Sequence, residues 1–115
     1  MTLEELRDEI DVLDRKLVEL LSERARAAKQ IGYLKAATSL PVYEPAREKV
    51  IYANVRAANK GPLPDIELTH IYERIIDVMR SLQRDELASE RNARAASSGH
   101  GDGAETTATE TGNKS

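Results

Sequence analysis

An apolar heptad stripe interrupted by one arginine runs through residues 1–37. Its members recur at alternating steps of three and four residues, the spacing of one helix face. The stripe consists of Leu3, Leu6, Ile10, Leu13, Leu17, Leu20, Arg24, Ala27, Ile31 and Leu34. This segment has no proline, and its single glycine is Gly32. The pattern therefore predicts one continuous helix of roughly nine turns with Arg24 on its apolar face.

Arg24 is the one permanently charged member of this stripe. Burying a guanidinium is costly unless an anion meets it. The sequence therefore predicts a carboxylate beside Arg24, supplied either by the protein or by a ligand.

The predicted helix is too long to be covered by its own chain. About 35 residues at 1.5 Å each give a helix of about 50 Å. A compact fold of about 90 residues has a radius of gyration near 12 Å. The uncovered part of the stripe predicts a partner, most simply a second copy in an intertwined homodimer.

Two shorter helices are predicted after the long one, so the fold class is all-α. The first helix should end near Thr38–Pro41, where threonine, serine and proline cluster. A second helix should run from Pro45 to about Asn59, followed by a break at residues 60–64. A third should begin near Asp65 and fray between residues 84 and 90. No segment shows the alternation of a half-buried strand.

The last part of the chain differs from the rest in composition. Residues 91–115 are rich in alanine, serine, threonine, glycine and charge, and contain no large apolar residue. Such a segment buries too little surface to offset its ordering entropy. We therefore expect a helical domain over residues 1–90 and a disordered low-complexity tail over residues 91–115.

Composition excludes several classes of protein. With 17 basic and 20 acidic residues the net charge is −3, which gives no electrostatic footprint for nucleic acid. The absence of cysteine excludes disulfides and thiolate metal sites. The acidic, amphipathic N-terminus differs from a signal peptide, and no apolar run approaches the ~20 residues that span a bilayer. We expect a cytoplasmic protein with neither membrane nor nucleic-acid partners.

The usual catalytic residue types are nearly absent. The two histidines are His70 and His100, and the second lies in the expected tail. No Gly-rich phosphate loop, metal-ligand cluster or nucleophile–base pair is present. An enzyme with this sequence would work without a nucleophile, a metal or a cofactor.

Charged residues on the long helix are the first candidates for a site. Arg24 and Lys35 are 11 residues apart, so they point within about 20° of the same direction. Arg7 lies 17 residues before Arg24 and is rotated by about 100°, so the two cannot converge within one chain. An antiparallel partner helix would bring its own Arg7 beside this half of the helix.

The shorter helices add further candidates, each with a plain structural alternative. Glu44, Arg47 and Glu48 lie at the start of the second helix, where acids also serve as ordinary N-terminal residues. Gln83 falls in phase with Met79 on the apolar face of the third helix. Its amide either points to solvent at a frayed end or donates a hydrogen bond inward.

Five segments together resemble the AroQ-type (all-helical) chorismate mutases. In the family's order and spacing they are Leu6–Asp14, Leu20–Arg24, Ile31–Lys35, Pro41–Glu48 and Arg80–Gln83. The likeness covers about residues 3–84. It implies an intertwined dimer of three-helix chains, in agreement with the uncovered stripe.

The resemblance also implies a reaction, the Claisen rearrangement of chorismate to prephenate on the route to phenylalanine and tyrosine. The reaction is unimolecular, which fits a chain without nucleophile or cofactor. Fixed cations would hold the reactive conformer and stabilise the negative charge that builds on the breaking ether oxygen.

The resemblance assigns each candidate a role. Arg24 and the partner chain's Arg7 would bind the two carboxylates of chorismate. Lys35 would reach a carboxylate and the ether oxygen, and Gln83 would donate to the same oxygen. The ring hydroxyl would be held by Glu48 with the backbone around Glu44, and Arg47 would support the carboxylate side.

Two positions depart from the family pattern. Met79 stands where several members have a small hydroxyl residue contacting the ring carboxylate, and it offers only shape and polarizability. Glu44 stands where an aspartate is common.

Two other functions stay open: an isochorismate pyruvate lyase of the same fold, and a non-catalytic helical module that regulates a partner enzyme.

Overall fold

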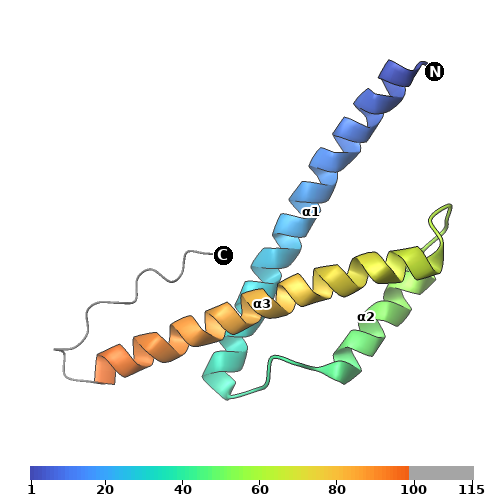
Figure 1. The fold of residues 1–115 in the computed structure, drawn as a ribbon. Coiled ribbons are helices and arrows are strands. Elements are labelled where there is room, and N and C mark those ends of the chain that lie inside the picture. Colours follow the sequence, from blue (N-terminus) through green and yellow to red (C-terminus); the bar gives the residue numbers. More distant parts are fainter. Residues whose placement is uncertain (99–115) are drawn as a thin grey trace.

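The computed structural model describes residues 1–98, and this part of the chain forms three helices without a strand (Figure 1). The helices are α1 (Leu3–Thr38), α2 (Pro45–Ala58) and α3 (Asp65–Ser98). The predicted all-α class with three helices is confirmed. None of the described helices is long and apolar enough to cross a membrane.

The ends of α1 follow from local side-chain and backbone chemistry. Thr2 Oγ1 accepts a hydrogen bond of 3.1 Å from the Glu5 amide, and Glu5 Oε1 accepts one of 2.8 Å from the Thr2 amide. This capping box satisfies two N–H groups at the helix start. At the other end Ser39 adopts the left-handed conformation with φ 63°, and its amide donates to Lys35 O. The predicted continuous first helix, ending near Thr38–Pro41, is confirmed.

The turn between α2 and α3 is fixed by one asparagine. Asn59 Nδ2 donates to Leu63 O at 2.8 Å and to Asp65 Oδ1 at 2.7 Å. The same side chain's Oδ1 accepts from the Gly61 amide at 3.0 Å. Asn59 thereby connects the end of α2 to the start of α3.

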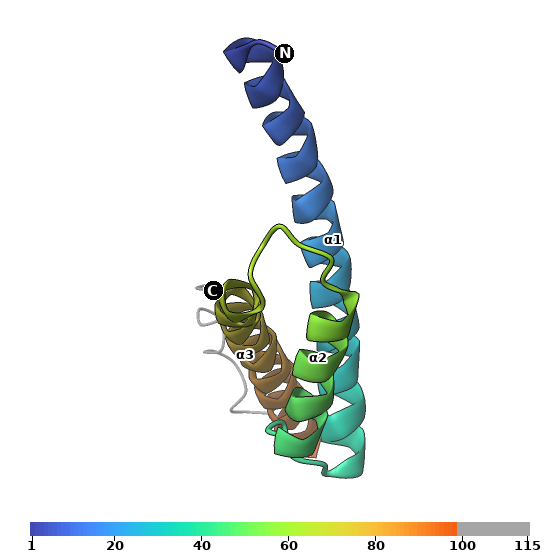
Figure 2. The same ribbon diagram turned by 90° about the vertical axis from the view of Figure 1, so that its right-hand side faces the viewer.

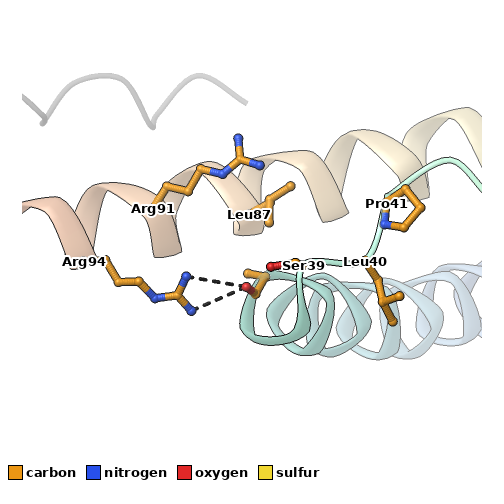
Figure 3. Close-up of a pocket in the computed structure, with 7 residues that line it drawn as sticks. Ser39, Leu40, Pro41, Leu87, Arg91 and Arg94 are labelled. Atoms are coloured by element: carbon orange, nitrogen blue, oxygen red, sulfur yellow. Dashed lines mark hydrogen bonds between the residues drawn. The ribbon is translucent and has the colours of Figure 1, made fainter.

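Helix α3 is longer than the sequence predicts. It continues to Ser98, so the expected fraying between residues 84 and 90 and the expected disorder over residues 91–98 are wrong. The physical reason is tertiary: both terminal nitrogens of Arg94 lie 3.5 Å from Ala36 O at the end of α1 (Figure 3). Carbonyls at a helix end lack intrahelical partners, so the guanidinium serves as an added cap. The remainder of the expected tail, residues 99–115, lies outside the described residues.

Helix α3 crosses the C-terminal third of α1, and the two backbones approach closely at Gly32. A Cβ atom at Gly32 would lie 2.8 Å from the Gln83 Cα. Around the crossing, the buried apolar residues are Ala28, Ala36, Ile76 and Met79. Helix α2 packs on α3, so α3 is the described helix that contacts both others.

The N-terminal half of α1 projects away from the other helices (Figures 1 and 2). The radius of gyration is 19.1 Å, against about 13 Å expected for a compact chain of this length. The first six members of the apolar stripe, Leu3 to Leu20, are between 44% and 62% exposed. One chain therefore leaves this part of the stripe uncovered, as the sequence predicts.

Replacing Gly32 by alanine is expected to destabilise the fold. Alanine gains about 1 kcal/mol of intrinsic helix propensity over glycine, but its methyl group would meet the α3 backbone. Because main chain cannot move aside as a flexible side chain can, overpacking should cost about 1–3 kcal/mol. We expect a lower urea midpoint for Gly32→Ala. The exposed Gln30→Ala on the same helix is the control; a Gly32→Ala protein more stable than that control would contradict the close crossing.

Candidate active site

The ammonium group of Lys35 lies at the centre of a small polar cluster. The Lys35 side chain is 6% exposed and comes from the last turn of α1. Its Nζ donates to Gln83 Oε1 at 2.9 Å and to Val42 O at 3.0 Å, and forms an ion pair with Glu44 Oε1 at 3.1 Å. Residues from α1, the following loop and α3 therefore meet at one buried cation.

The orientation of the Gln83 amide follows from this contact. Because Oε1 accepts from the ammonium, the amide nitrogen Nε2 is left as a donor. Within residues 1–98 that nitrogen has no hydrogen-bond acceptor. Of the two alternatives for Gln83, a solvent-facing amide at a frayed end is wrong, because the helix continues beyond it and the side chain meets Lys35.

A second cluster joins α2, α3 and the loop before α2. Arg80 Nε lies 3.0 Å from Glu48 Oε2, and Arg80 Nη2 donates to Asp77 Oδ1 at 3.1 Å. The guanidinium carbon stands 5.2 Å from the centroid of the Tyr43 ring, within the range of a cation–π contact. Glu48 is thus paired with a cation that the sequence did not suggest.

Acidic groups outnumber cations around this second cluster. Partial burial raises the pKa of the Tyr52 hydroxyl, and the carboxylates of Glu73, Glu48 and Asp77 raise it further. Arg80 opposes them by lowering the pKa. The net shift favours the neutral phenol, which is also the form of an unperturbed tyrosine at neutral pH.

Arg24 and Lys35 both face α3, as their helical phase predicts. The Arg24 guanidinium lies 5.9 Å from the centroid of the Tyr72 ring. It is half-buried, and no carboxylate within the described part of the chain forms an ion pair with it. The anion predicted beside Arg24 is therefore not supplied by this part of a single chain.

One candidate cation, Arg7, lies far from the Lys35 cluster in one chain, and a second, Arg47, has no hydrogen bond or ion pair to the site within residues 1–98. Arg7 is exposed, with its Nη1 3.7 Å from Glu4 Oε2 on the free half of α1. It precedes Lys35 by 28 residues, about 42 Å along the helix. Arg47 is exposed on the first turn of α2. Met79 is 6% exposed and belongs to the apolar core beneath Gln83.

Sequence reasoning missed three partners of the site: the Val42 carbonyl, Tyr43 and Arg80. A main-chain acceptor leaves no residue-type signal. Asp77 and Arg80 are three residues apart, a pairing visible along the helix, but the Glu48 partner depends on how α2 packs on α3.

The residues present suit organic anions better than a metal. No group of three histidine, cysteine or acidic side chains among the described residues could hold a metal ion.

A separate cavity of about 310 Å³ lies between the ends of α1 and α3 (Figure 3). It is lined by Ala36, Ser39, Leu40, Pro41, Leu87, Arg91 and Arg94.

Comparison with known families matches residues 6–84 to the family described as chorismate mutase type II. The chain belongs to this family. The match spans all three helices and includes Lys35, Glu44, Glu48 and Gln83.

Relatives and solved structures agree with the family. The bifunctional chorismate mutase/prephenate dehydratase of Aquifex aeolicus is 42% identical over 86 residues, covering 71% of this chain and 24% of that protein. The chorismate mutase of Methanocaldococcus jannaschii is 32% identical over 91 residues, covering 78% of this chain and 92% of that protein. The form II structure of chorismate mutase from Thermus thermophilus superposes with a TM-score of 0.70 at 35% identity, covering 71% of this chain and 93% of that one.

The chain spans about a quarter of the length of the bifunctional relatives it matches. The similarity to the Methanocaldococcus jannaschii protein instead extends over nearly the whole of that relative.

Replacing Lys35 by alanine is expected to destabilise this type II family member. The change leaves Val42 O and Gln83 Oε1 without their donor and Glu44 without its counter-ion. Unsatisfied buried groups cost about 1–3 kcal/mol each, so we expect a loss of about 2–4 kcal/mol in urea unfolding. The exposed Lys29→Ala, on the same helix, should change stability by less than about 0.5 kcal/mol. Equal effects of the two changes would show that the Lys35 contacts do not support the fold.

Proposed function

We propose that this protein catalyses the rearrangement of chorismate to prephenate. The observation that carries the proposal is the buried Lys35 ammonium held against Gln83, in a chain of the chorismate mutase type II family. The reaction breaks the ether C–O bond and forms a C–C bond in one cyclic movement of electrons. It needs no external nucleophile, proton acceptor or electron carrier.

Catalysis by this site would be electrostatic and conformational. Chorismate carries two carboxylates, and its ether oxygen gains negative charge as the C–O bond breaks. Lys35 Nζ and the free donor on Gln83 Nε2 would both address that oxygen, and Arg24 would bind a carboxylate. Fixed donors in a partly dry site stabilise developing charge more than water does, since they need no reorganisation.

The Lys35 contacts also suggest how substrate is admitted. Two of the three ammonium N–H groups are taken by Val42 O and Gln83 Oε1. Glu44, about half-exposed, neutralises the charge through an ion pair. A substrate oxygen would take the third N–H group, and the Glu44 carboxylate would withdraw into solvent. The main chain of Glu44, together with the Glu48 side chain, would hold the ring hydroxyl of chorismate. Arg47 would support the carboxylate side.

A second copy of the chain would complete the site. One chain leaves the stripe on the N-terminal half of α1 exposed and holds Arg7 about 42 Å from Lys35 along the helix. Antiparallel pairing of two α1 helices would bury both stripes and bring Arg7 of each copy toward the Arg24 of the other. The proposal is therefore a homodimer with two shared sites.

The direct test is chorismate loss followed by absorbance with the purified protein and no addition except substrate. We expect prephenate as the product. Isochorismate, offered in a parallel assay, distinguishes the lyase of the same fold by its products salicylate and pyruvate. Turnover of isochorismate without turnover of chorismate would overturn the proposal, and so would inertness toward both.

Arg24→Ala is expected to lower activity without lowering stability. Losing a charge-assisted carboxylate contact in a desolvated site should cost about 3–5 kcal/mol of transition-state stabilisation. This is roughly two to four orders of magnitude in kcat/KM. The free protein should unfold at nearly the same urea concentration, because no described carboxylate pairs with Arg24. The exposed Arg26→Ala is the matched control, and full activity with a destabilised protein would assign Arg24 a structural role instead.

Mixed dimers test whether Arg7 acts across the interface. Arg7→Ala and Arg24→Ala proteins, each impaired alone, should regain activity after subunit exchange. About half of the dimers in an equal mixture are hybrids with one intact site of two, so activity should reach about a quarter of the wild-type value. If exchange is demonstrated by mass spectrometry and activity stays at the level of the parents, Arg7 does not serve the partner's site.

A further inference from the structure

We propose that Arg80 is a positioning residue, which holds the Glu48 carboxylate where it accepts a hydrogen bond from the ring hydroxyl of chorismate. The inference rests on the proposed function and adds to it a residue on α3. Its basis is the cluster in which one guanidinium meets Glu48, Asp77 and Tyr43.

Two contacts besides the one with Glu48 hold the Arg80 guanidinium in place. Its Nη2 donates to Asp77 Oδ1 at 3.1 Å, one turn back on α3, and its central carbon lies over the Tyr43 ring at 5.2 Å from the centroid. The Arg80 side chain is 26% exposed. A planar group fixed on two sides loses little further freedom when it pairs with a carboxylate. Arg80 is therefore a preorganised partner for Glu48.

The form of the contact leaves Glu48 able to bind a ligand. Arg80 Nε lies 3.0 Å from Glu48 Oε2, but this buried nitrogen lacks the alignment of a hydrogen bond to any described residue. The attraction is ionic and involves Oε2, whereas Oε1, the second oxygen of the carboxylate, makes no hydrogen bond or ion pair within residues 1–98. Glu48, 18% exposed, is thus held in place while Oε1 remains available to a hydroxyl group.

Arg80 also links the two halves of the site. Tyr43, on which it stacks, lies between Val42 and Glu44, the two loop residues that contact Lys35. The loop is therefore attached to the Lys35 ammonium on one side and to the Arg80 guanidinium on the other. Glu48 is expected to hold the ring hydroxyl, and Lys35 is expected to meet the ether oxygen. The distance between these two side chains depends on both attachments.

A purely structural role is the competing explanation, since Arg80 also joins α2 to α3. The two roles differ in their kinetics. Misplacing a hydroxyl acceptor weakens ground-state and transition-state binding alike, so KM rises while kcat changes little. A loosened fold instead reduces the amount of active protein, which lowers apparent kcat and adds its effect to that of any other variant.

The experiment is a double-mutant cycle on the full-length protein, with chorismate as substrate and urea unfolding measured on every variant. The variants are Arg80→Met, Glu48→Gln and the double change, with Arg84→Met, an exposed arginine one turn further along α3, as the control. We expect Arg80→Met to raise KM about tenfold or more with kcat within about threefold of wild type. The double variant should be no more than about twofold worse than Glu48→Gln.

A conservative variant keeps the test decisive if Arg80→Met folds poorly. Arg80→Lys retains the charge but not the planar fork over Tyr43, so it should recover part of the lost KM effect. Strictly additive effects of Arg80→Met and Glu48→Gln would overturn the inference, and so would a wild-type KM in Arg80→Met. Both outcomes leave the proposed function intact provided that wild-type protein converts chorismate. A wild-type protein that fails to convert chorismate refutes the function and this inference with it.

Discussion

The ammonium group of Lys35 is buried where α1, α3 and the loop between α1 and α2 meet. The site depends on the contacts that compensate for the burial of this charge. Two hydrogen bonds and an ion pair surround it. These contacts require α1 and α3 to approach closely, which Gly32 permits because it has no Cβ to meet Gln83. A buried cation of this kind stabilises one arrangement of the chain and also offers its remaining N–H group to an anion.

The second constraint is the length of α1. A helix of 36 residues extends far beyond what α3 covers, so the stripe from Leu3 to Leu20 stays exposed in one chain. The same half carries Arg7, a cation remote from Lys35. The proposed dimer explains both facts. Pairing would cover the exposed stripe on the N-terminal half of α1 and would bring Arg7, on the same half, to the partner's site. Stability and activity of the family member would then depend on the same association.

The candidate site divides into residues that the sequence could and could not identify. Helical phase alone placed Arg24 and Lys35 on one face, and the structure turns both toward α3. Gln83 was ambiguous, because its environment depends on whether the helix continues. Helix α3 does continue to Ser98, supported by Arg94 at the end of α1, and sequence composition wrongly favoured disorder for residues 91–98. Composition measures apolar content, whereas this extension is supported by helical backbone and by tertiary contacts such as that of Arg94 with Ala36.

The sequence by itself determined the all-α class, the continuity and end of α1, the break between α2 and α3, and the exposure of the N-terminal part of the stripe in one chain. These properties follow from spacing and local backbone chemistry, which act over a few residues. Only the tertiary structure decided that Arg80 faces Glu48 and that the Val42 carbonyl meets Lys35. Such contacts depend on the angle and register at which helices pack, and these arise from the fit of whole surfaces rather than from any short segment.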